Sequence, residues 1–152
     1  MTVDVGQEAP DFTLPDQNKA PVTLSSFRGT HNVVLVFYPF AFSGVCTGEL
    51  CALRDELPAF ETAQTRILAV SIDSVFAHRV YADRERIDYP LLSDFWPHGA
   101  VAKAYGVFND DIGAAMRGTF VIDRTGIVRW KVQNALPDAR DVAEYEKVLA
   151  EL

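Results

Sequence analysis

Short runs of apolar residues, separated by polar segments, predict the strands of this chain. The runs VVLVFYP (33–39) and RILAVSID (66–73) are apolar without alternation, which is typical of strands buried on both faces of a sheet. Further extended segments are expected at 11–14, 22–27 and 89–94. A hairpin is expected from 118–123 and 127–132, with its turn at Thr125-Gly126.

Helical periodicity appears between these strands. Apolar residues recur at helical spacing after Ser43, a suitable N-cap, and Pro58 is expected to kink this helix or end it nearby. Further helices are expected at 74–87, 99–107 and 137–152, the last with Pro137 and Asp138 at its start.

The order of these elements indicates an α/β fold with a β-rich N-terminal extension. Alternating strands and helices predict a central sheet flanked by helices, and the late hairpin makes that sheet mixed. A length of 152 residues predicts one domain, 1–152. In such sheets the site lies where a helix begins after the carboxyl end of a central strand. Cys46 follows strand 33–39 at such a place.

Composition and charge exclude some functions. The net charge is −7 and the sequence pI is about 4.8, which argues against nucleic acid and against an anionic membrane surface as partners. The longest apolar run, 33–42, contains Pro39 and is too short to span a bilayer. No targeting segment is visible, so we expect a cytoplasmic protein whose thiols are kept reduced.

Cys46 and Cys51 are the two cysteines of the chain. With Ser43 as N-cap, Cys46 is the third helical residue, where free N–H groups and the helix dipole favour a thiolate. Cysteines at helix N-termini can have pKa values of roughly 3.5 to 7.5, against about 8.5 for free cysteine. The spacing alone leaves open a nucleophilic Cys46 or a small apolar core residue.

Cys51 cannot bridge Cys46 while both lie on one continuous α-helix. Residues five apart differ by about 140° in direction and about 7.5 Å in rise, so their Cα atoms are roughly 8.6 Å apart. A disulfide needs Cα atoms within about 7 Å, so the first turns would have to unwind. The alternative is a buried helix residue beside Leu50 and Leu53.

Other cysteine chemistries fit less well. His31, His78 and His98 are scattered, and together with C-x4-C they match no zinc finger or ribbon, so no metal is expected. A thioredoxin-type C-x-x-C is absent.

The segment YPFAFSGVC resembles the active-site motif of the peroxiredoxins, Pro-x-x-x-Thr/Ser-x-x-Cys, with Pro39, Ser43 and Cys46 in the matching places. RGTFVIDRTG resembles the family segment with the active-site arginine, here Arg117. PLLSDFWPHGAVAKAYGVFN is similar to the alkyl hydroperoxide reductase E type.

This resemblance implies a thioredoxin-like fold and a thiol-dependent peroxidase without cofactor or metal. Cys46 would form a sulfenic acid with hydrogen peroxide, organic hydroperoxides or peroxynitrite. Ser43 would hydrogen-bond the thiolate and the peroxide, Arg117 would stabilise negative charge, and Pro39 would line the pocket. A reducing redoxin or a low-molecular-weight thiol is the implied partner, and a homodimer is expected.

Cys51 departs from the E-type pattern, because Q-type (bacterioferritin-comigratory) peroxiredoxins place a resolving cysteine five residues after the peroxidatic one. We therefore expect Cys51, buried on an intact helix in the reduced protein, to resolve the Cys46 sulfenic acid after local unwinding. Gly44 and Gly48 weaken the helix there. Glu49 either tunes the site or only solvates the first turns, and it stays outside the predicted site.

Two other functions remain open on the sequence. One is a thioredoxin-type thiol–disulfide oxidoreductase, and the other is a non-catalytic redox sensor or holdase. The aromatic residues at 40, 42, 96 and 108 are expected either to form an apolar contact patch or to pack in the core.

Overall fold

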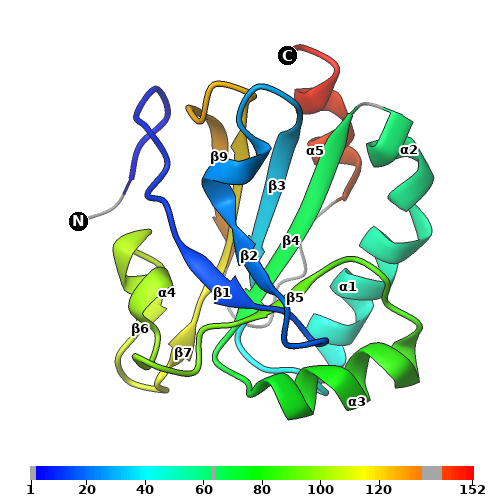
Figure 1. The fold of residues 1–152 in the computed structure, drawn as a ribbon, viewed down its shortest axis with the longest axis vertical. Coiled ribbons are helices and arrows are strands. Elements are labelled where there is room, and N and C mark those ends of the chain that lie inside the picture. The colour runs from blue at the N-terminus through cyan, green and yellow to red at the C-terminus, as the bar shows by residue number, and fades with distance from the viewer. Residues whose placement is uncertain (1–2, 63, 135–141) are drawn as a thin grey trace.

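The computed structural model describes residues 3–62, 64–134 and 142–152. Its centre is a five-stranded mixed sheet in the order β5–β4–β3–β8–β9 (Figure 1). The strands are β3 (Asn32–Phe37), β4 (Thr65–Ser71), β5 (Leu91–Ser93), β8 (Arg117–Ile122) and β9 (Val128–Asn134). β3, β4 and β5 run parallel, whereas β8 is antiparallel to β3 and to β9, so the predicted mixed α/β sheet is confirmed.

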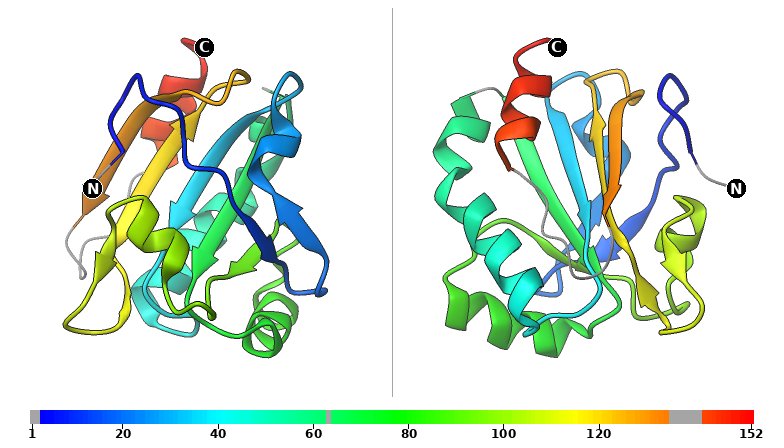
Figure 2. Two further views of the ribbon diagram at one scale, coloured as in Figure 1. Left: turned by 60° about the vertical axis from the view of Figure 1, so that its left-hand side comes forward. Right: turned by 180° about the vertical axis from the view of Figure 1, so that it is seen from behind.

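β3 is buried on both faces because its alternate side chains enter two separate cores. Val34 and Val36 join a core with helices α1 (Gly44–Asp55), α2 (Leu57–Thr62), α3 (Val75–Glu85) and α5 (Val142–Leu149). Val33, Leu35 and Phe37 join the other core, under the N-terminal segment and α4 (Ala100–Ala104). Figure 2 shows these two layers on opposite sides of the sheet. The continuous apolar run of β3 thus follows from its central position.

The N-terminal extension forms a small hairpin of β1 (Thr13–Pro15) and β2 (Pro21–Thr23). The prediction of an extended segment over 22–27 is wrong beyond Thr23, because Leu24–Phe27 forms the 3-10 helix η1. Two hydrogen bonds favour this turn: the Ser26 hydroxyl donates to the nearby Thr23 carbonyl oxygen, and the Ser25 amide donates to Oδ1 of Asp11, 14 residues earlier.

The other element boundaries follow local signals. α1 ends at Asp55, three residues before Pro58, as expected. Ser74 caps α3, its Oγ accepting a hydrogen bond from the Ala77 amide at 3.1 Å. Gly126, at φ 87°, makes the predicted turn of the β8–β9 hairpin.

One short pair of strands was not predicted. β6 (Phe108–Asn109) and β7 (Ala114–Ala115) form a short pair that the periodicity did not indicate, because two-residue strands leave no pattern. The predicted helix start at Pro137 and Asp138 lies outside the described residues. No helix of the described segments is long and apolar enough to cross a membrane.

Candidate active site

Cys46 lies at the start of α1, directly after the loop that leaves the carboxyl end of β3. Ser43 is the N-cap residue in an extended conformation, and its carbonyl accepts a hydrogen bond from the Thr47 amide at 2.9 Å. Cys46 is therefore the third helical residue, as predicted, and its side chain is 0% exposed. Pro39 is buried in the same loop.

The Ser43 side chain does not cap the helix. Its hydroxyl donates to the carbonyl oxygen of Phe40 at 3.1 Å, and no side-chain cap hydrogen bond forms. The N-cap prediction is thus correct for the backbone and wrong for the side chain. The hydrogen bond to Phe40 instead closes the loop that precedes Cys46.

Arg117 reaches Cys46 from the first position of β8. The guanidinium is 4% exposed, and its Nη1 donates a hydrogen bond to Cys46 Sγ at 3.2 Å. β8 pairs with β3, so the sheet itself brings residue 117 beside a helix start 71 residues earlier. A permanent cation at this distance favours the anionic form of a sulfur.

Glu49 completes this buried cluster. Its Oε1 is 2.5 Å from the same Nη1 of Arg117, and its side chain is 3% exposed. Burying a guanidinium is costly unless a carboxylate or other acceptor compensates it. Our sequence interpretation left Glu49 outside the site. The signal that could have included it is the i, i+3 spacing from Cys46, which places both side chains on one face of a helix.

A buried polar network holds the loop before α1 from the side of β4 and α3. The Ala41 amide donates to Asp73 Oδ2 at 2.8 Å, and the Ser71 hydroxyl donates to the same oxygen at 2.6 Å. His78 Nε2 is 2.8 Å from Ser71 Oγ and 3.0 Å from the Tyr38 hydroxyl. Burial lowers the pKa of His78 from 6.5 to about 4, so this histidine is neutral at pH 7.

Aromatic contacts brace the same loop. Phe42 has a left-handed backbone, at φ 68°, and the centroid of its ring lies 4.8 Å from the ring centroid of Tyr81. The Tyr81 hydroxyl is 2.8 Å from Thr47 Oγ1, and burial raises the pKa of Tyr81 to about 12. α3 therefore holds both the loop and the first turns of α1.

Cys51 occupies a different environment on the same helix. It is partly exposed, so the prediction of a buried Cys51 is wrong, although the helix is intact and both thiols are free. Its Sγ donates to Glu85 Oε2 on α3 at 3.6 Å. Desolvation raises the pKa of the Cys51 thiol, Arg54 opposes this shift, and Glu85 adds to it.

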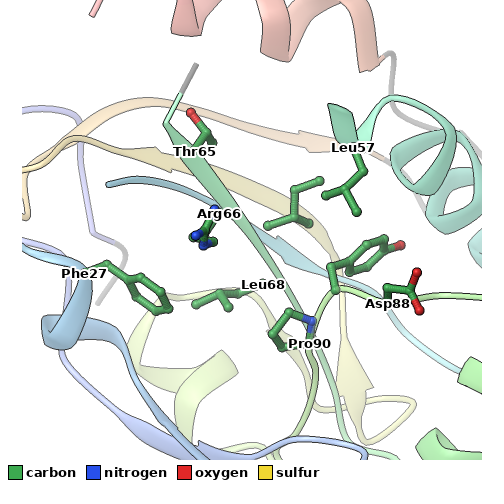
Figure 3. Close-up of a pocket in the computed structure, with 9 residues that line it drawn as sticks. Phe27, Leu57, Thr65, Arg66, Leu68, Asp88 and Pro90 are labelled. Atoms are coloured by element: carbon green, nitrogen blue, oxygen red, sulfur yellow. The ribbon is translucent and has the colours of Figure 1, made fainter. Parts of the chain in front are cut away.

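Other hollows and clusters lie away from this site. A surface pocket of about 650 Å³ lies along the amino half of β4, lined by residues such as Phe27, Leu57 and Arg66 (Figure 3). It is at the opposite end of the parallel strands from Cys46 and contains none of the predicted site residues. In the described part of the chain, no three His, Cys, Asp or Glu side chains are grouped to hold a metal ion.

Comparison with solved structures gives the class of protein. The reduced 2-Cys peroxiredoxin of Plasmodium vivax superposes with a TM-score of 0.88 at 32% identity, over 96% of this chain and 80% of that chain. Peroxidoxin BcpB from Mycobacterium tuberculosis gives a TM-score of 0.84 at 36% identity, over 96% and 94%. The fold is thus the thioredoxin-like fold of the peroxiredoxins, as the resemblance implied.

Sequence relatives lead to the same class. Alkyl hydroperoxide reductase E of Mycobacterium tuberculosis is 51% identical over 150 residues, which cover 99% of this chain and 98% of the relative. The model of the AhpC/TSA family matches residues 5–131. The chain belongs to the AhpC/TSA family, and its function is that of a thiol-dependent peroxidase. A thioredoxin-type oxidoreductase is not favoured.

Proposed function

We propose that Cys46 is the residue that reduces the peroxide. The Cys46 thiolate attacks one peroxide oxygen, a sulfur–oxygen bond forms, and the oxygen–oxygen bond breaks. The sulfur becomes a sulfenic acid, and the leaving oxygen takes up a proton to give water or an alcohol. Hydrogen peroxide, organic hydroperoxides and peroxynitrite are the proposed substrates.

The single observation that supports this proposal most is the hydrogen bond from Arg117 Nη1 to the buried Cys46 Sγ, at 3.2 Å. In a buried site the guanidinium stabilises both the thiolate and the charge that develops on the leaving oxygen. Glu49, at 2.5 Å from the same nitrogen, acts as a positioning residue that holds the guanidinium in place.

Ser43 and Pro39 are proposed to shape the peroxide site. Rotation of the Ser43 hydroxyl away from the Phe40 carbonyl would let it donate to the thiolate or to the bound peroxide. Pro39 has no N–H, so it lines the loop without adding a competing donor. Because Cys46 is 0% exposed, its sulfur meets peroxide only when this loop or the first turn of α1 moves.

Recycling of the sulfenic acid is proposed to use either Cys51 or an external thiol, from a redoxin or a small molecule. Cys51 on the intact α1 is roughly 8.6 Å from Cys46 between Cα atoms, so the internal route needs the first turns to unwind. Gly44 and Gly48 are exposed, and a Cβ added at either would meet no atom within 4 Å, which is consistent with a helix start that can open.

The one-domain chain 1–152 is proposed to act in the cytoplasm as a homodimer. Two free thiols are consistent with a reducing compartment. Three of the four aromatic residues considered above are exposed (Phe40 39%, Phe42 44% and Trp96 79%), whereas Phe108 is half-buried against the core. The exposed three could supply an apolar surface for a second copy.

The test compares two cysteine variants. Cys46→Ser should abolish rapid peroxide consumption, measured by stopped flow with one equivalent of hydrogen peroxide. Cys51→Ser, the matched control five residues away on the same helix, should keep the rate of the first oxidation. Unchanged consumption by Cys46→Ser would show that another group reduces the peroxide.

Mass spectrometry of the oxidised protein tests the recycling route separately. An intramolecular Cys46–Cys51 disulfide in the wild type, absent from Cys51→Ser, supports the internal route. A persistent sulfenic acid, or mixed disulfides with added thiol alone, supports the external one.

A further inference from the structure

We infer that Glu85 slows the reaction of Cys51 with oxidised Cys46, because its carboxylate keeps Cys51 in the thiol form. This inference rests on the proposed function, since it concerns the internal recycling route. It predicts that a residue on α3, outside the peroxide-reducing cluster, determines how much oxidised Cys46 reacts with Cys51 and how much reacts with an external thiol.

Cys51 on α1 and Glu85 on α3 are in side-chain contact across two neighbouring helices. Cys51 Sγ donates to Glu85 Oε2 at 3.6 Å, with Cys51 partly exposed. A carboxylate that accepts this hydrogen bond stabilises the S–H form and destabilises the thiolate, which is the nucleophile in disulfide formation. Cys46 meets the opposite charge, the Arg117 guanidinium.

Arg84 pairs with the other carboxylate oxygen of Glu85 at 3.6 Å, but its side chain is 68% exposed, so solvent screens this pair. The other charged and titratable groups around Cys51 do not cancel the effect of Glu85 either. Arg54, on the same helix as Cys51, favours the thiolate, whereas Asp55 disfavours it. The Tyr81 and Tyr89 hydroxyls also face this region, and burial raises the pKa of both, so they remain neutral near pH 7. Desolvation is the largest influence, and all these influences together raise the pKa of Cys51.

Glu85 stays beside Cys51 if only the first turns of α1 unwind. The second half of α1 is anchored at two places: the Tyr89 hydroxyl donates to the Leu50 carbonyl at 2.6 Å, and Arg54 Nη1 donates to the backbone carbonyl of Glu85 at 2.5 Å. Cys46 would therefore move towards Cys51, while Cys51 stays in place beside Glu85. The Glu85 carboxylate would disfavour the Cys51 thiolate until the proton of Cys51 is lost.

The slowed step is an ordinary condensation. Cys51 loses its proton, its sulfur attacks the sulfenic sulfur of Cys46, and a sulfur–sulfur bond forms while the sulfur–oxygen bond breaks. The departing hydroxide takes up a proton to give water. Cys51 is oxidised and the sulfenic sulfur is reduced, with the peroxide of the first step as the overall oxidant.

The first experiment measures Cys51 alone, in a Cys46→Ser background. Glu85→Gln removes the charge but keeps the backbone carbonyl that Arg54 binds. Alkylation of Cys51 by iodoacetamide at pH 8 should become about three- to tenfold faster, because removing a nearby anion raises the thiolate fraction. Asp83→Asn, which removes an exposed carboxylate two residues earlier on α3, is the matched control and should change nothing. An unchanged or slower alkylation of Glu85→Gln overturns the role of Glu85.

The second experiment uses the chain with both cysteines. After one equivalent of hydrogen peroxide, the Cys46–Cys51 disulfide should form faster in Glu85→Gln than in the wild type, by quenched mass spectrometry, with the first oxidation unchanged. If neither protein forms the disulfide, the internal recycling route is overturned, whatever the alkylation rates show. The two failures are therefore distinguishable.

Discussion

The two halves of α1 contain the same residue type in opposite surroundings. In the first half, Cys46 is 0% exposed and accepts a hydrogen bond from the guanidinium of Arg117. In the second half, Cys51 is partly exposed and donates to the carboxylate of Glu85. Both cysteines lie on one helix, and the charged side chain nearest each sulfur differs: Arg117 from β8 beside Cys46, and Glu85 from α3 beside Cys51.

This contrast shows how one helix can hold two cysteines five residues apart that meet opposite charges. Cys46 also lies in the first turn, where free N–H groups add to the cationic field, whereas Cys51 lies beyond it. Under the proposed function, the first half of α1 reacts with peroxide and the second half controls recycling. The following predictions aim to remove or exaggerate that contrast.

The largest effect is expected from Arg117→Ala. Loss of a buried charge that stabilises the thiolate and the leaving oxygen should slow Cys46 oxidation by about 100- to 1,000-fold, measured by stopped flow. Alkylation of Cys51 should stay at the wild-type rate, because Arg117 does not contact it.

Arg117→Lys is the control for a folding defect in that experiment, because it keeps a positive charge beside Glu49. It should fold and oxidise at a rate between those of the wild type and Arg117→Ala, because lysine lacks the planar fork of the guanidinium. A wild-type oxidation rate in folded Arg117→Ala would contradict the role proposed for this residue.

A smaller effect is expected when acid protonates the network that holds the loop before Cys46, and the quantity that changes is the stability of the folded protein. Burial lowers the pKa of His78 from 6.5 to about 4, so between these values the unfolded chain binds a proton that the folded protein does not. Stability should therefore fall as the pH falls through this window, by about 2 kcal/mol between pH 7 and pH 5.

Urea unfolding at the two pH values measures this change, and His78→Gln provides the reference without the titrating group. The fall in stability should be smaller in the variant by about the contribution of His78. Equal falls in both proteins would mean that His78 is not the group responsible.

The smallest effect is expected from Gly48→Ala, which stabilises the helix between the two cysteines. The added methyl group meets no neighbour within 4 Å, so it fits without strain. Alanine favours a helix by about 1 kcal/mol over glycine, so unwinding, and with it disulfide formation, should slow about fivefold. Mass spectrometry of quenched samples follows the disulfide.

Oxidation of Cys46 by peroxide should change less than disulfide formation in Gly48→Ala. Gly44→Ala adds the same methyl group in open space at the first helical position, where helix propensity counts less, so it should slow disulfide formation less than Gly48→Ala does. If Gly48→Ala forms the disulfide as fast as the wild type, unwinding of α1 does not limit recycling.

Much of the fold could be read from local patterns. The continuous apolar runs of β3 and β4, the Ser74 cap of α3, and the turn at Gly126 depend on short-range chemistry, and the structure confirms them. The segment after Thr23 was misjudged because hydrogen bonds of the Ser26 side chain and of the Asp11 carboxylate hold its backbone in a turn, and β6 and β7 were too short to leave a pattern.

The site was predicted less completely than the fold. Cys46, Arg117 and Pro39 lie in one buried region, but the Ser43 hydroxyl bonds to Phe40, Cys51 is partly exposed, and Glu49 was left out. The neighbours of Glu49 and Cys51 come from distant segments, at Arg117 and Glu85. A helical pattern indicates which residues share a face, but not which charge that face meets.

By itself, the sequence determined the alternation of strands and helices and the position of Cys46 in the first turn of α1, because backbone geometry and capping act over a few residues. The pairing of β8 with β3 and the packing of α3 on α1 decided the rest. Those long-range contacts put Arg117 beside one sulfur and Glu85 beside the other. Charge at a few ångströms, in a partly dehydrated site, then makes two cysteines of one helix chemically different.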